Sequence, residues 1–290
     1  MRKGKTMTYR QLCTVLQDAK IENAEWDALC LMEHFCAISP SLLRAAPERD
    51  YENAALENAA RRRISHEPLQ YILGEWEFYR QRYEVSPDCL IPRADTEILV
   101  EEAIRILPPA AHFADLCTGS GCIAVSTLAE RPDTRAVALE KFPATLALAE
   151  RNAQKNGVTA RFCGVLADVL SPSPSLDEHA PFDAILSNPP YIPTRDIASL
   201  SPEVYAEPAA ALDGGEDGLL FYRAILKNYT SLLKKDGFFL FEIGFDQAKD
   251  LISLGKAHAF AHIRVLRDLG GRDRVVYISN KPYEERSTSL

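Results

Sequence analysis

The sequence has no long hydrophobic run. None of the apolar stretches in its 290 residues approaches the roughly 18 residues that a membrane-spanning helix requires. The first segment, Met1–Met7, lacks the apolar core of a secretory signal peptide. We therefore expect no membrane partner and a cytoplasmic location.

Positive charge is also in short supply. Lys and Arg total 33 against 41 Asp and Glu, which gives a net charge of −8. Repulsion between this charge and phosphates opposes sequence-independent capture of duplex DNA, so no stable nucleic-acid complex is expected. We interpret the triplet Arg61-Arg62-Arg63 as cations that complement the dipole of a helix in its last turn.

Motifs for metal binding and for disulfides are missing as well. The seven cysteines, an odd number, contain no Cys-x-x-Cys pair, which fits free thiols in a reducing compartment. His258 and His262 stand four residues apart and could share a helix face, but no Glu or Cys nearby completes a ligand set. We expect neither a disulfide nor a bound metal.

The chain divides into three parts. Residues 1–74 carry helical patterns of apolar residues, with Thr8 as a first N-cap, and predict a small all-α domain. Residues 75–94 alternate in aromatic and polar character and predict a β-hairpin linker. Residues 95–290 alternate between strand and helix patterns, which predicts a doubly wound, mostly parallel seven-stranded α/β sheet.

The pairing of the last two predicted strands distinguishes between two fold classes. The segment between the last two strands, 263–267 and 274–279, is too short for a helical crossover, so these strands must pair antiparallel. A parallel sheet with a terminal antiparallel hairpin is typical of methyltransferases that use S-adenosylmethionine. Dehydrogenase cofactor domains normally finish parallel.

A glycine turn follows the predicted strand 111–116. Gly119 and Gly121 let the backbone approach a ligand closely, and the helix that follows offers unpaired N–H groups. Glu140 ends the next predicted strand, where its carboxylate could hold both ribose hydroxyls of a nucleotide. Residues 119–124 also fit the dinucleotide pattern G-x-G-x-x-[GA], so this turn alone leaves a dehydrogenase open.

The segment Asn188-Pro189-Pro190-Tyr191 follows the predicted buried strand 182–187. Asn188 would lie at the carboxyl end of that strand, where open α/β sheets bind ligands. Its amide can accept and donate, both prolines leave carbonyl oxygens as local acceptors, and Tyr191 could stack on a flat substrate. The tetrapeptide predicts a site for a planar nitrogen, either an amide or N6 of adenine.

Several motifs together resemble the release-factor glutamine N5-methyltransferases, in order and over nearly the whole chain. They are Glu67–Gly74, Ile91–Glu97, Asp115–Gly121, Asn188–Tyr191, Glu207-Pro208, Gly214-Gly215 and Asp217-Gly218. The resemblance implies methyl transfer from S-adenosylmethionine to the glutamine side-chain nitrogen in the Gly-Gly-Gln loop of peptide-chain release factors. We expect a monomer whose helical domain, which has no phosphate or ribose motif, recognises the protein substrate.

The resemblance also implies roles for the site residues. The methionine part of the cofactor would lie on the glycine turn, its ribose against Glu140 and its adenine beside Asp168 and Val169. The implied cofactor-binding residues are Cys117, Thr118, Gly119, Ser120, Gly121, Glu140, Asp168, Val169 and Asn188. The implied catalytic residues are Asn188, Pro189, Pro190 and Tyr191.

Four positions depart from the family pattern. Cys117 stands where Gly is usual, Ala94 where Pro is usual, Glu140 where Asp is commoner, and Val169 where an aromatic residue is often found. A cysteine can replace the first glycine only if its φ stays below zero, so we expect that conformation at Cys117. The aliphatic side chain of Val169 offers the adenine no aromatic ring to stack on.

We expect Asn188 to act by orienting the nitrogen that receives the methyl group. An amide nitrogen is a poor nucleophile because its lone pair is delocalised into the carbonyl group. If the Asn188 side chain and the Pro189 carbonyl accept its two N–H groups, the lone pair is directed at the sulfonium methyl. No general base is evident in the motif, and the proton would leave late, to solvent.

Three alternatives stay open on the sequence alone. The methylated glutamine could belong to a ribosomal protein, as in a close relative of this family. The same four residues would also suit N6 of adenine in a nucleic acid. A non-catalytic module that senses the cofactor is the third alternative.

Overall fold

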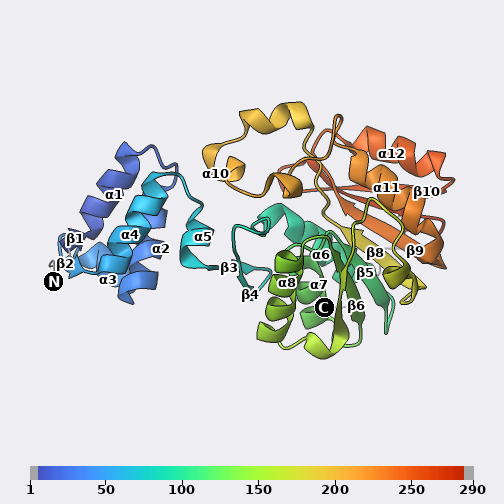
Figure 1. Cartoon of the computed structure of the whole chain (residues 1–290), viewed down its shortest axis with the longest axis horizontal. Helices are drawn as coiled ribbons and strands as arrows, with labels where there is room; N and C mark the ends of the chain where they lie inside the picture. The colour runs from blue at the N-terminus through green and yellow to red at the C-terminus, as the bar shows by residue number, and fades with distance from the viewer. Residues whose placement is uncertain (1–5, 284–290) are drawn as a thin grey trace. The chain divides into compact units, whose positions relative to one another are not determined.

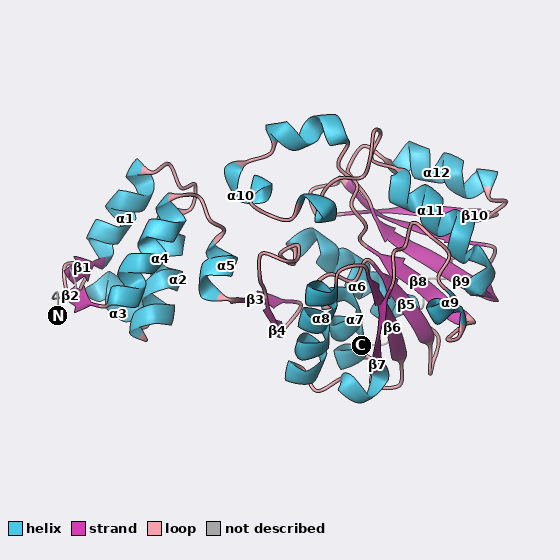
Figure 2. Ribbon diagram, in the orientation of Figure 1, coloured by secondary structure: helices cyan, strands magenta, loops and turns pink. Residues whose placement is uncertain are grey.

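Figures 1 and 2 show the computed structural model of the chain, which describes residues 6–283. The start of the segment that lacks a signal-peptide core, and the last residues of the predicted α/β part, lie outside this range. The chain forms two compact units. The smaller one contains Met1–Glu75 and Leu200–Ala206, and the larger one contains Trp76–Ser199 and Glu207–Leu290.

The smaller unit is helical, as predicted. Thr8 forms a capping box at its first helix: its hydroxyl accepts from the Gln11 N–H at 3.1 Å, and the Gln11 side chain accepts from the Thr8 N–H at 3.0 Å. Two three-residue strands, too short to be read from the sequence, pair antiparallel beside the helices. The elements are β1 (Thr6–Thr8), α1 (Tyr9–Asp18), α2 (Ala24–Cys36), α3 (Pro40–Ala45), β2 (Asp50–Glu52), α4 (Ala54–Ile64), α5 (Leu69–Leu73) and α10 (Pro202–Tyr205).

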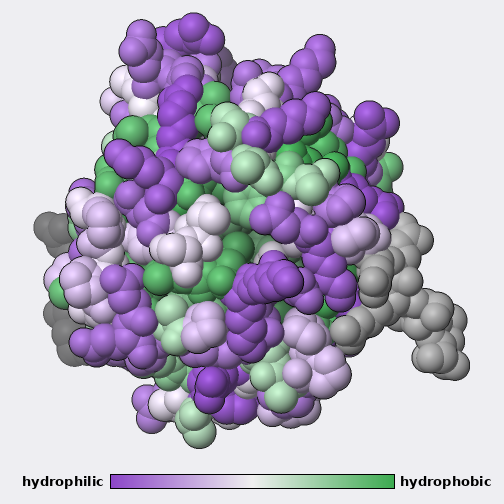
Figure 3. All heavy atoms as spheres, turned by 90° about the vertical axis from the view of Figure 1, so that its right-hand side faces the viewer, coloured by the Kyte–Doolittle hydropathy of each residue, from purple (hydrophilic) through white to green (hydrophobic). Residues whose placement is uncertain are grey.

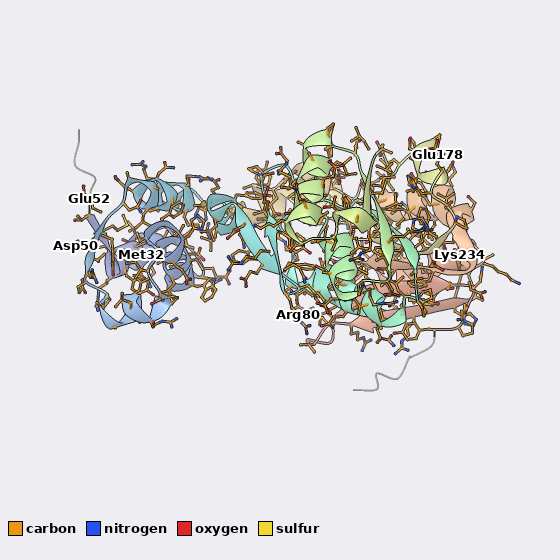
Figure 4. The ribbon with its side chains drawn as sticks, turned by 90° about the horizontal axis from the view of Figure 1, so that it is seen from below. Met32, Asp50, Glu52, Arg80, Glu178 and Lys234 are labelled. Atoms are coloured by element: carbon orange, nitrogen blue, oxygen red, sulfur yellow. The ribbon has the colours of Figure 1, made fainter. Side chains whose placement is uncertain are left out.

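A buried ion pair holds α2, α4 and α10 of this unit together. The guanidinium of Arg63 lies 2.7 Å from the Asp27 carboxylate and 3.2 Å from that of Glu203 on α10. Met32 of α2 is fully buried within the helical unit (Figure 4). The segment Leu200–Ala206 therefore belongs to the helical unit by its side chains, although it is distant in sequence.

The larger unit begins at Trp76, within the predicted hairpin, and contains the rest of that hairpin. Phe78 and Tyr83 of the hairpin pack in the core beside helix α6 (Ala94–Ile106), and the Tyr83 hydroxyl hydrogen bonds to Ser126 at 2.5 Å. The strands are β3 (Glu75–Phe78) and β4 (Gln81–Glu84) for the hairpin, then β5 (His112–Leu116), β6 (Arg135–Glu140), β7 (Phe162–Leu166), β8 (Phe182–Ser187), β9 (Leu233–Glu242), β10 (His262–Arg267) and β11 (Asp273–Ser279).

The main sheet has seven strands in the order β10-β11-β9-β8-β5-β6-β7. Strands β9, β8, β5, β6 and β7 are parallel neighbours, and β11 pairs antiparallel with both β9 and β10. The predicted terminal antiparallel hairpin is thus confirmed, with its second strand inserted between β9 and β10. The methyltransferase ending of the sheet is present.

Helices cover both faces of the sheet (Figure 2). Alternate residues of β5 show why: Phe113 enters the core with α6 and α7, while Ala114 enters the core with α11 and α12. The helices are α6 (Ala94–Ile106), α7 (Cys122–Glu130), α8 (Pro143–Lys155), α9 (Pro174–Asp177), α11 (Leu220–Tyr229) and α12 (Ala248–Ala257). Hydrophilic side chains cover much of the face seen in Figure 3, with hydrophobic areas between them. Among the described residues, no helix is long and apolar enough to cross a membrane.

Candidate active site

A cavity of about 320 Å³ opens in the larger unit, where β5, β6 and β8 end. Eight of the predicted cofactor residues line it: Cys117, Thr118, Gly119, Ser120, Glu140, Asp168, Val169 and Asn188. Pro190 also lines the cavity, whereas Gly121, Pro189 and Tyr191 are not among its wall residues. The structure thus brings nine of the predicted residues to one cavity, and the roles of all twelve stay predictions.

Hydrogen bonds to the carboxylate of Asp115 fix the shape of the glycine turn. Its carboxylate is fully buried and accepts from the Thr118 hydroxyl at 2.6 Å and from the Ala124 N–H at 3.2 Å. Gly121 has a φ of 81°, and a Cβ there would lie 3.2 Å from the Ala149 side chain of α8. Gly121 therefore serves the close packing of α7 against α8 and stays behind the cavity wall.

The expectation for Cys117 is wrong. Its φ is +61°, in the left-handed region that L-residues other than Gly, Asn and Asp seldom adopt. The neighbouring groups hold it there: the Thr118 N–H bonds the Leu139 carbonyl at 3.1 Å, and the Cys117 side chain packs against the hydrophobic core. The turn thus has at Cys117 the left-handed backbone that a glycine would adopt, and the cysteine bears the strain of that conformation.

Glu140 lies at the end of β6 with its carboxylate turned toward the glycine turn. Oε2 accepts from the Gly119 N–H at 3.1 Å, and Oε1 accepts from the N–H groups of Lys141 at 2.8 Å and Phe142 at 3.1 Å. Burial raises the pKa of Glu140, and these three hydrogen bonds oppose that rise. The side chain therefore supports the cavity wall, and Oε2 keeps a lone pair for a ligand hydroxyl.

Asp168 forms the next acidic position on the rim. Burial acts to raise its pKa, but the Leu170 N–H at 3.0 Å and the Lys141 ammonium at 2.9 Å outweigh this effect and hold the pKa below its usual value. Val169 beside it is buried and lines the cavity with an aliphatic surface. Lys141 and Phe142, which also line the cavity, were not predicted as site residues.

Asn188 reaches the cavity from the end of β8. Its Nδ2 group donates to the hydroxyl of Thr96 at 3.1 Å. Thr96 belongs to the Ile91–Glu97 motif, lies on α6, and was not predicted as a site residue. Because the NH₂ group is turned toward Thr96, the carbonyl end of the Asn188 amide is the end available to a ligand.

The glycine motif at 214–218 holds the segment that follows Asn188. A Cβ on Gly218 would lie 2.3 Å from the Tyr191 carbonyl oxygen, and a Cβ on Gly214 would lie 2.7 Å from the Tyr191 Cα. The Gln247 side chain donates to the carbonyls of both Tyr191 and Gly218, at 3.0 and 3.2 Å. These glycines are thus required because two backbone segments touch.

Two further motifs from the sequence meet at the cavity. Glu207 is buried, accepts from the Ile91 N–H at 2.9 Å and forms an ion pair with Arg93. Ile91, Arg93 and Pro208 line the cavity. No local sequence pattern predicts the contact of Glu207 with Ile91 and Arg93, because these residues are more than a hundred positions apart in the chain.

A buried carboxyl group lies behind Asn188. Glu242, the last residue of β9, is 1% exposed, and its Oε1 accepts from the Tyr191 hydroxyl at 3.4 Å. Burial raises the pKa of Glu242 to about 7, while hydrogen bonding from Thr96 and Tyr191 and the charge of Arg274 act to lower it. Tyr191 is thereby directed to the protein interior, and its predicted stacking on a substrate stays a prediction.

No group of three or more His, Cys, Asp or Glu residues in the described part of the chain could hold a metal ion. His258 caps the end of α12 and His262 opens β10, so the two do not share a helix as the sequence suggested. The polar groups of the cavity include the carboxylates of Glu140 and Asp168 and the acceptor of Asn188, together with hydroxyls and the cations of Arg93 and Lys141. The carboxylates and the Asn188 acceptor suit a ligand with hydroxyls or a positive charge.

Comparison with known proteins gives matches along most of the chain. Residues 8–74 match the family model "PrmC N-terminal domain", and residues 94–235 match "Methyltransferase small domain". The chain is 41% identical to a release factor glutamine methyltransferase of Cereibacter sphaeroides over 265 residues, which cover 90% of this chain and 93% of the relative. It is 44% identical to that of Geobacter sulfurreducens over 232 residues, 79% of each chain.

A solved structure supports the fold. The hMettl16 catalytic domain, in complex with MAT2A 3'UTR hairpin 6, matches with a TM-score of 0.56 and covers 80% of this chain and 84% of that one. At 16% identity this likeness speaks for the methyltransferase architecture alone.

Proposed function

Because the chain belongs to the release factor glutamine methyltransferase family, we propose that it methylates the side-chain nitrogen of the glutamine in the Gly-Gly-Gln loop of peptide-chain release factors, with S-adenosylmethionine as the methyl donor. The observation that carries the proposal is that Asn188 lines the same cavity as Gly119, Glu140 and Asp168. A nucleotide cofactor and a planar amide can therefore meet in one cavity.

The cavity residues fit the cofactor chemically. The free lone pair of Glu140 Oε2 suits a ribose hydroxyl, and Val169 gives the adenine an aliphatic surface. Thr118, Gly119 and Ser120 would hold the methionine part. When bound, S-adenosylmethionine supplies an electrophilic methyl group on a sulfonium, which is a good leaving group.

The chain supplies orientation. Oδ1 of Asn188 accepts one N–H of the target glutamine and the Pro189 carbonyl accepts the other, so the nitrogen lone pair faces the methyl group. The bound cofactor would supply the methyl group for the new nitrogen–carbon bond, and its sulfur would keep the electron pair of the broken sulfur–carbon bond. The nitrogen then loses a proton to solvent, which leaves a neutral N-methyl amide.

The test is methyl transfer from labelled cofactor to a purified release factor. We expect label in the release factor and none in a variant whose Gly-Gly-Gln glutamine is replaced by Ala. A ribosomal protein and adenine-containing DNA are included as competing substrates. Label in either of these and none in the release factor would overturn the proposal, and a complete lack of transfer would favour a cofactor-sensing module.

A further inference from the structure

We propose that Gln247 is a positioning residue for methyl transfer, whose side chain holds the backbone of Asn188–Tyr191 and so sets the direction of the Pro189 carbonyl. This inference rests on the proposed function, because it takes that carbonyl as an acceptor for the target amide. The described residues of the cavity wall do not include Gln247, so it acts through the segment that it holds. Its effect on that segment can be measured without any substrate.

The segment depends on support from other elements because two of its four residues are prolines. A proline has no backbone N–H and cannot anchor itself by donating to a neighbouring segment. Before the prolines, the Asn188 side chain is held by Thr96. After them, the Tyr191 carbonyl accepts from Gln247 Nε2 at 3.0 Å. The direction of the Pro189 carbonyl is therefore set by the contacts on either side of it.

The side-chain amide of Gln247 uses both of its protons. Its NH₂ group donates to the carbonyls of Tyr191 at 3.0 Å and Gly218 at 3.2 Å, and its oxygen accepts from the Gly244 N–H at 2.9 Å. A glutamine NH₂ group has two donors, and each of them here has an acceptor. The reversed amide would place its oxygen against two carbonyl oxygens and its NH₂ group against an N–H. The three contacts therefore allow one direction only.

Burial and two glycines make these contacts close. Gln247 is 6% exposed, so water cannot readily replace a lost partner. A Cβ on Gly218 would lie 2.7 Å from Gln247 Nε2, and a Cβ on Gly244 would lie 3.1 Å from Oε1. The absence of side chains at these two positions gives the amide room between the segments that it joins.

The turn between β9 and α12 fixes the backbone of Gln247. The residue is the N-cap of α12, and its carbonyl accepts from the N–H groups of Asp250 and Leu251, each at 3.1 Å. Its own N–H donates to the Gly244 carbonyl at 3.0 Å. The amide thus extends from a fixed point at the end of the sheet, and every residue that it contacts belongs to the larger unit.

A short bridge next to Tyr191 reports on this support. The Ile192 N–H donates to the Leu212 carbonyl at 3.0 Å, and the Gly214 N–H donates to the Ile192 carbonyl at 2.8 Å. These bonds join the same two segments as Gln247. If Gln247 loses its donors, the bridge keeps fewer contacts around it and should open more often.

The first measurement is hydrogen exchange in the full-length protein without cofactor or substrate. Q247M keeps the length of the side chain but has no donor. We expect it to speed the exchange of the Ile192 and Gly214 N–H groups by about tenfold or more, because local opening becomes easier. Equal exchange of these groups in wild type and Q247M would overturn the inference, whatever substrate the enzyme uses.

N156D is the matched control. Asn156 also donates to two backbone carbonyls of the larger unit, those of Arg82 at 3.1 Å and Asn152 at 2.9 Å. The described residues of the cavity wall include neither Asn156 nor these two partners. We expect N156D to lower the stability of the protein but to leave exchange at Ile192 as it is in the wild type.

The second measurement is turnover with a release factor. We expect Q247M to lower kcat by about 10- to 100-fold with cofactor affinity within about twofold, since a small misplacement at a reacting centre costs up to about 10²-fold. Q247E, of the same size as the wild-type residue, keeps the acceptor for Gly244 but loses both donors, and should be similarly slow. It gives the test if Q247M does not fold. N156D should keep the wild-type kcat.

Wild-type kcat in either Gln247 variant, or an equal loss of kcat in N156D, would overturn the positioning role. Failure of the wild type to methylate any glutamine would count against the proposed function alone, since the exchange result stands apart from it.

Discussion

Asp115 and Glu242 are buried carboxyl groups that the larger unit keeps without enough partners. Burial raises the pKa of each to about 7, and each has one oxygen with no hydrogen-bond partner. A raised pKa in the folded state means that the folded protein disfavours the charged form. Both groups lie directly behind predicted site residues. Such carboxyl groups are typical of sites in which the orientation of side chains is maintained at the expense of folding stability.

Replacing Glu242 with Gln should therefore stabilise the protein at high pH. The stability difference is absent below the unfolded pKa of about 4.5, develops as pH rises, and is complete above about 7. At 1.4 kcal/mol per pKa unit, it amounts to about 3 kcal/mol at most. Urea denaturation of both proteins at pH 5 and pH 8 measures it. Destabilisation of E242Q that is larger at pH 8 than at pH 5 would instead show that the charge is needed to neutralise Arg274.

Asn188 carries the orientation of the target nitrogen. N188A should lower kcat by about 10²–10³, the usual cost of one positioned hydrogen-bonding group at a reacting centre, with a smaller effect on cofactor affinity. N188D separates the two ends of the amide, because the aspartate keeps an acceptor but loses the donor to Thr96. A partly active N188D supports acceptance as the main role. Near-normal turnover of N188A would remove Asn188 from the mechanism.

Replacing Glu140 with Ala alone does not isolate its contact with the cofactor, so two substitutions are compared. E140A removes the acceptor of three backbone N–H groups as well as any ribose contact, so it should weaken cofactor binding by about 1.5–3 kcal/mol and loosen the glycine turn. E140Q keeps an oxygen that can serve the Lys141 and Phe142 N–H groups but places an NH₂ beside Gly119 or the ribose. Calorimetric titration with the cofactor distinguishes the two variants. Unchanged affinity in both would exclude Glu140 from cofactor binding.

At the scale of elements, the glycine motif at 214–218 acts as a fitted support for Asn188–Tyr191. G218A would push a methyl group against the Tyr191 carbonyl, whereas Gly157, with a similar φ of 71°, has open space around it. Both substitutions strain the backbone alike, so the excess effect of G218A over G157A measures the contact. We expect G218A to lower both stability and kcat and G157A to lower stability alone. Equal kcat in the two variants would show that this contact does not support the site.

The elements that the sequence predicted are those with strong periodicity. The patterns predict buried strands at 111–116, 135–139 and 182–187 and helices at 95–107, 120–130 and 143–156. Strands β5, β6 and β8 and helices α6, α7 and α8 begin and end within two residues of these positions. Strand β7, predicted at 160–164, begins two residues later, because residues 159–161 form a 3₁₀ turn. The antiparallel pairing of β10 with β11 was predicted from one short connection, whereas the insertion of β11 between β9 and β10 was not predicted.

The site residues that the sequence missed are those brought in from other elements. Thr96 and Glu242 lie on α6 and β9, and nothing in their local pattern distinguishes them from helix-capping or strand-end residues. The positive φ of Cys117 was missed because the residue type argued against it. Tertiary contacts, which a single sequence does not display, decide all three positions.

At the scale of the whole molecule, the two compact units have separate expected tasks. The larger unit contains every residue of the cavity wall. Removing residues 1–75 should leave cofactor affinity within a few-fold of that of the full chain, but it would also strip Glu203 of α10 of Arg63 and His66, its partners in the helical unit. A second truncation that also replaces Leu200–Ala206 with a Gly/Ser linker controls for this exposure.

Both truncated proteins should lose methylation of the intact protein substrate, because the helical unit is expected to recognise it. Isothermal titration with the cofactor and a methylation assay give the two readouts. Loss of cofactor binding in both proteins would show that the helical unit supports the cavity. Full activity in either would assign substrate recognition to the larger unit.

The placement of Leu200–Ala206 in the helical unit also has a consequence for the order in which the chain is made. A domain generally folds as soon as its sequence has left the ribosome. Here Arg63 meets Asp27 early, but its other partner, Glu203, is synthesised 140 residues later. The helical unit therefore leaves the ribosome first, but its fold is completed only after β5 to β8 have been translated.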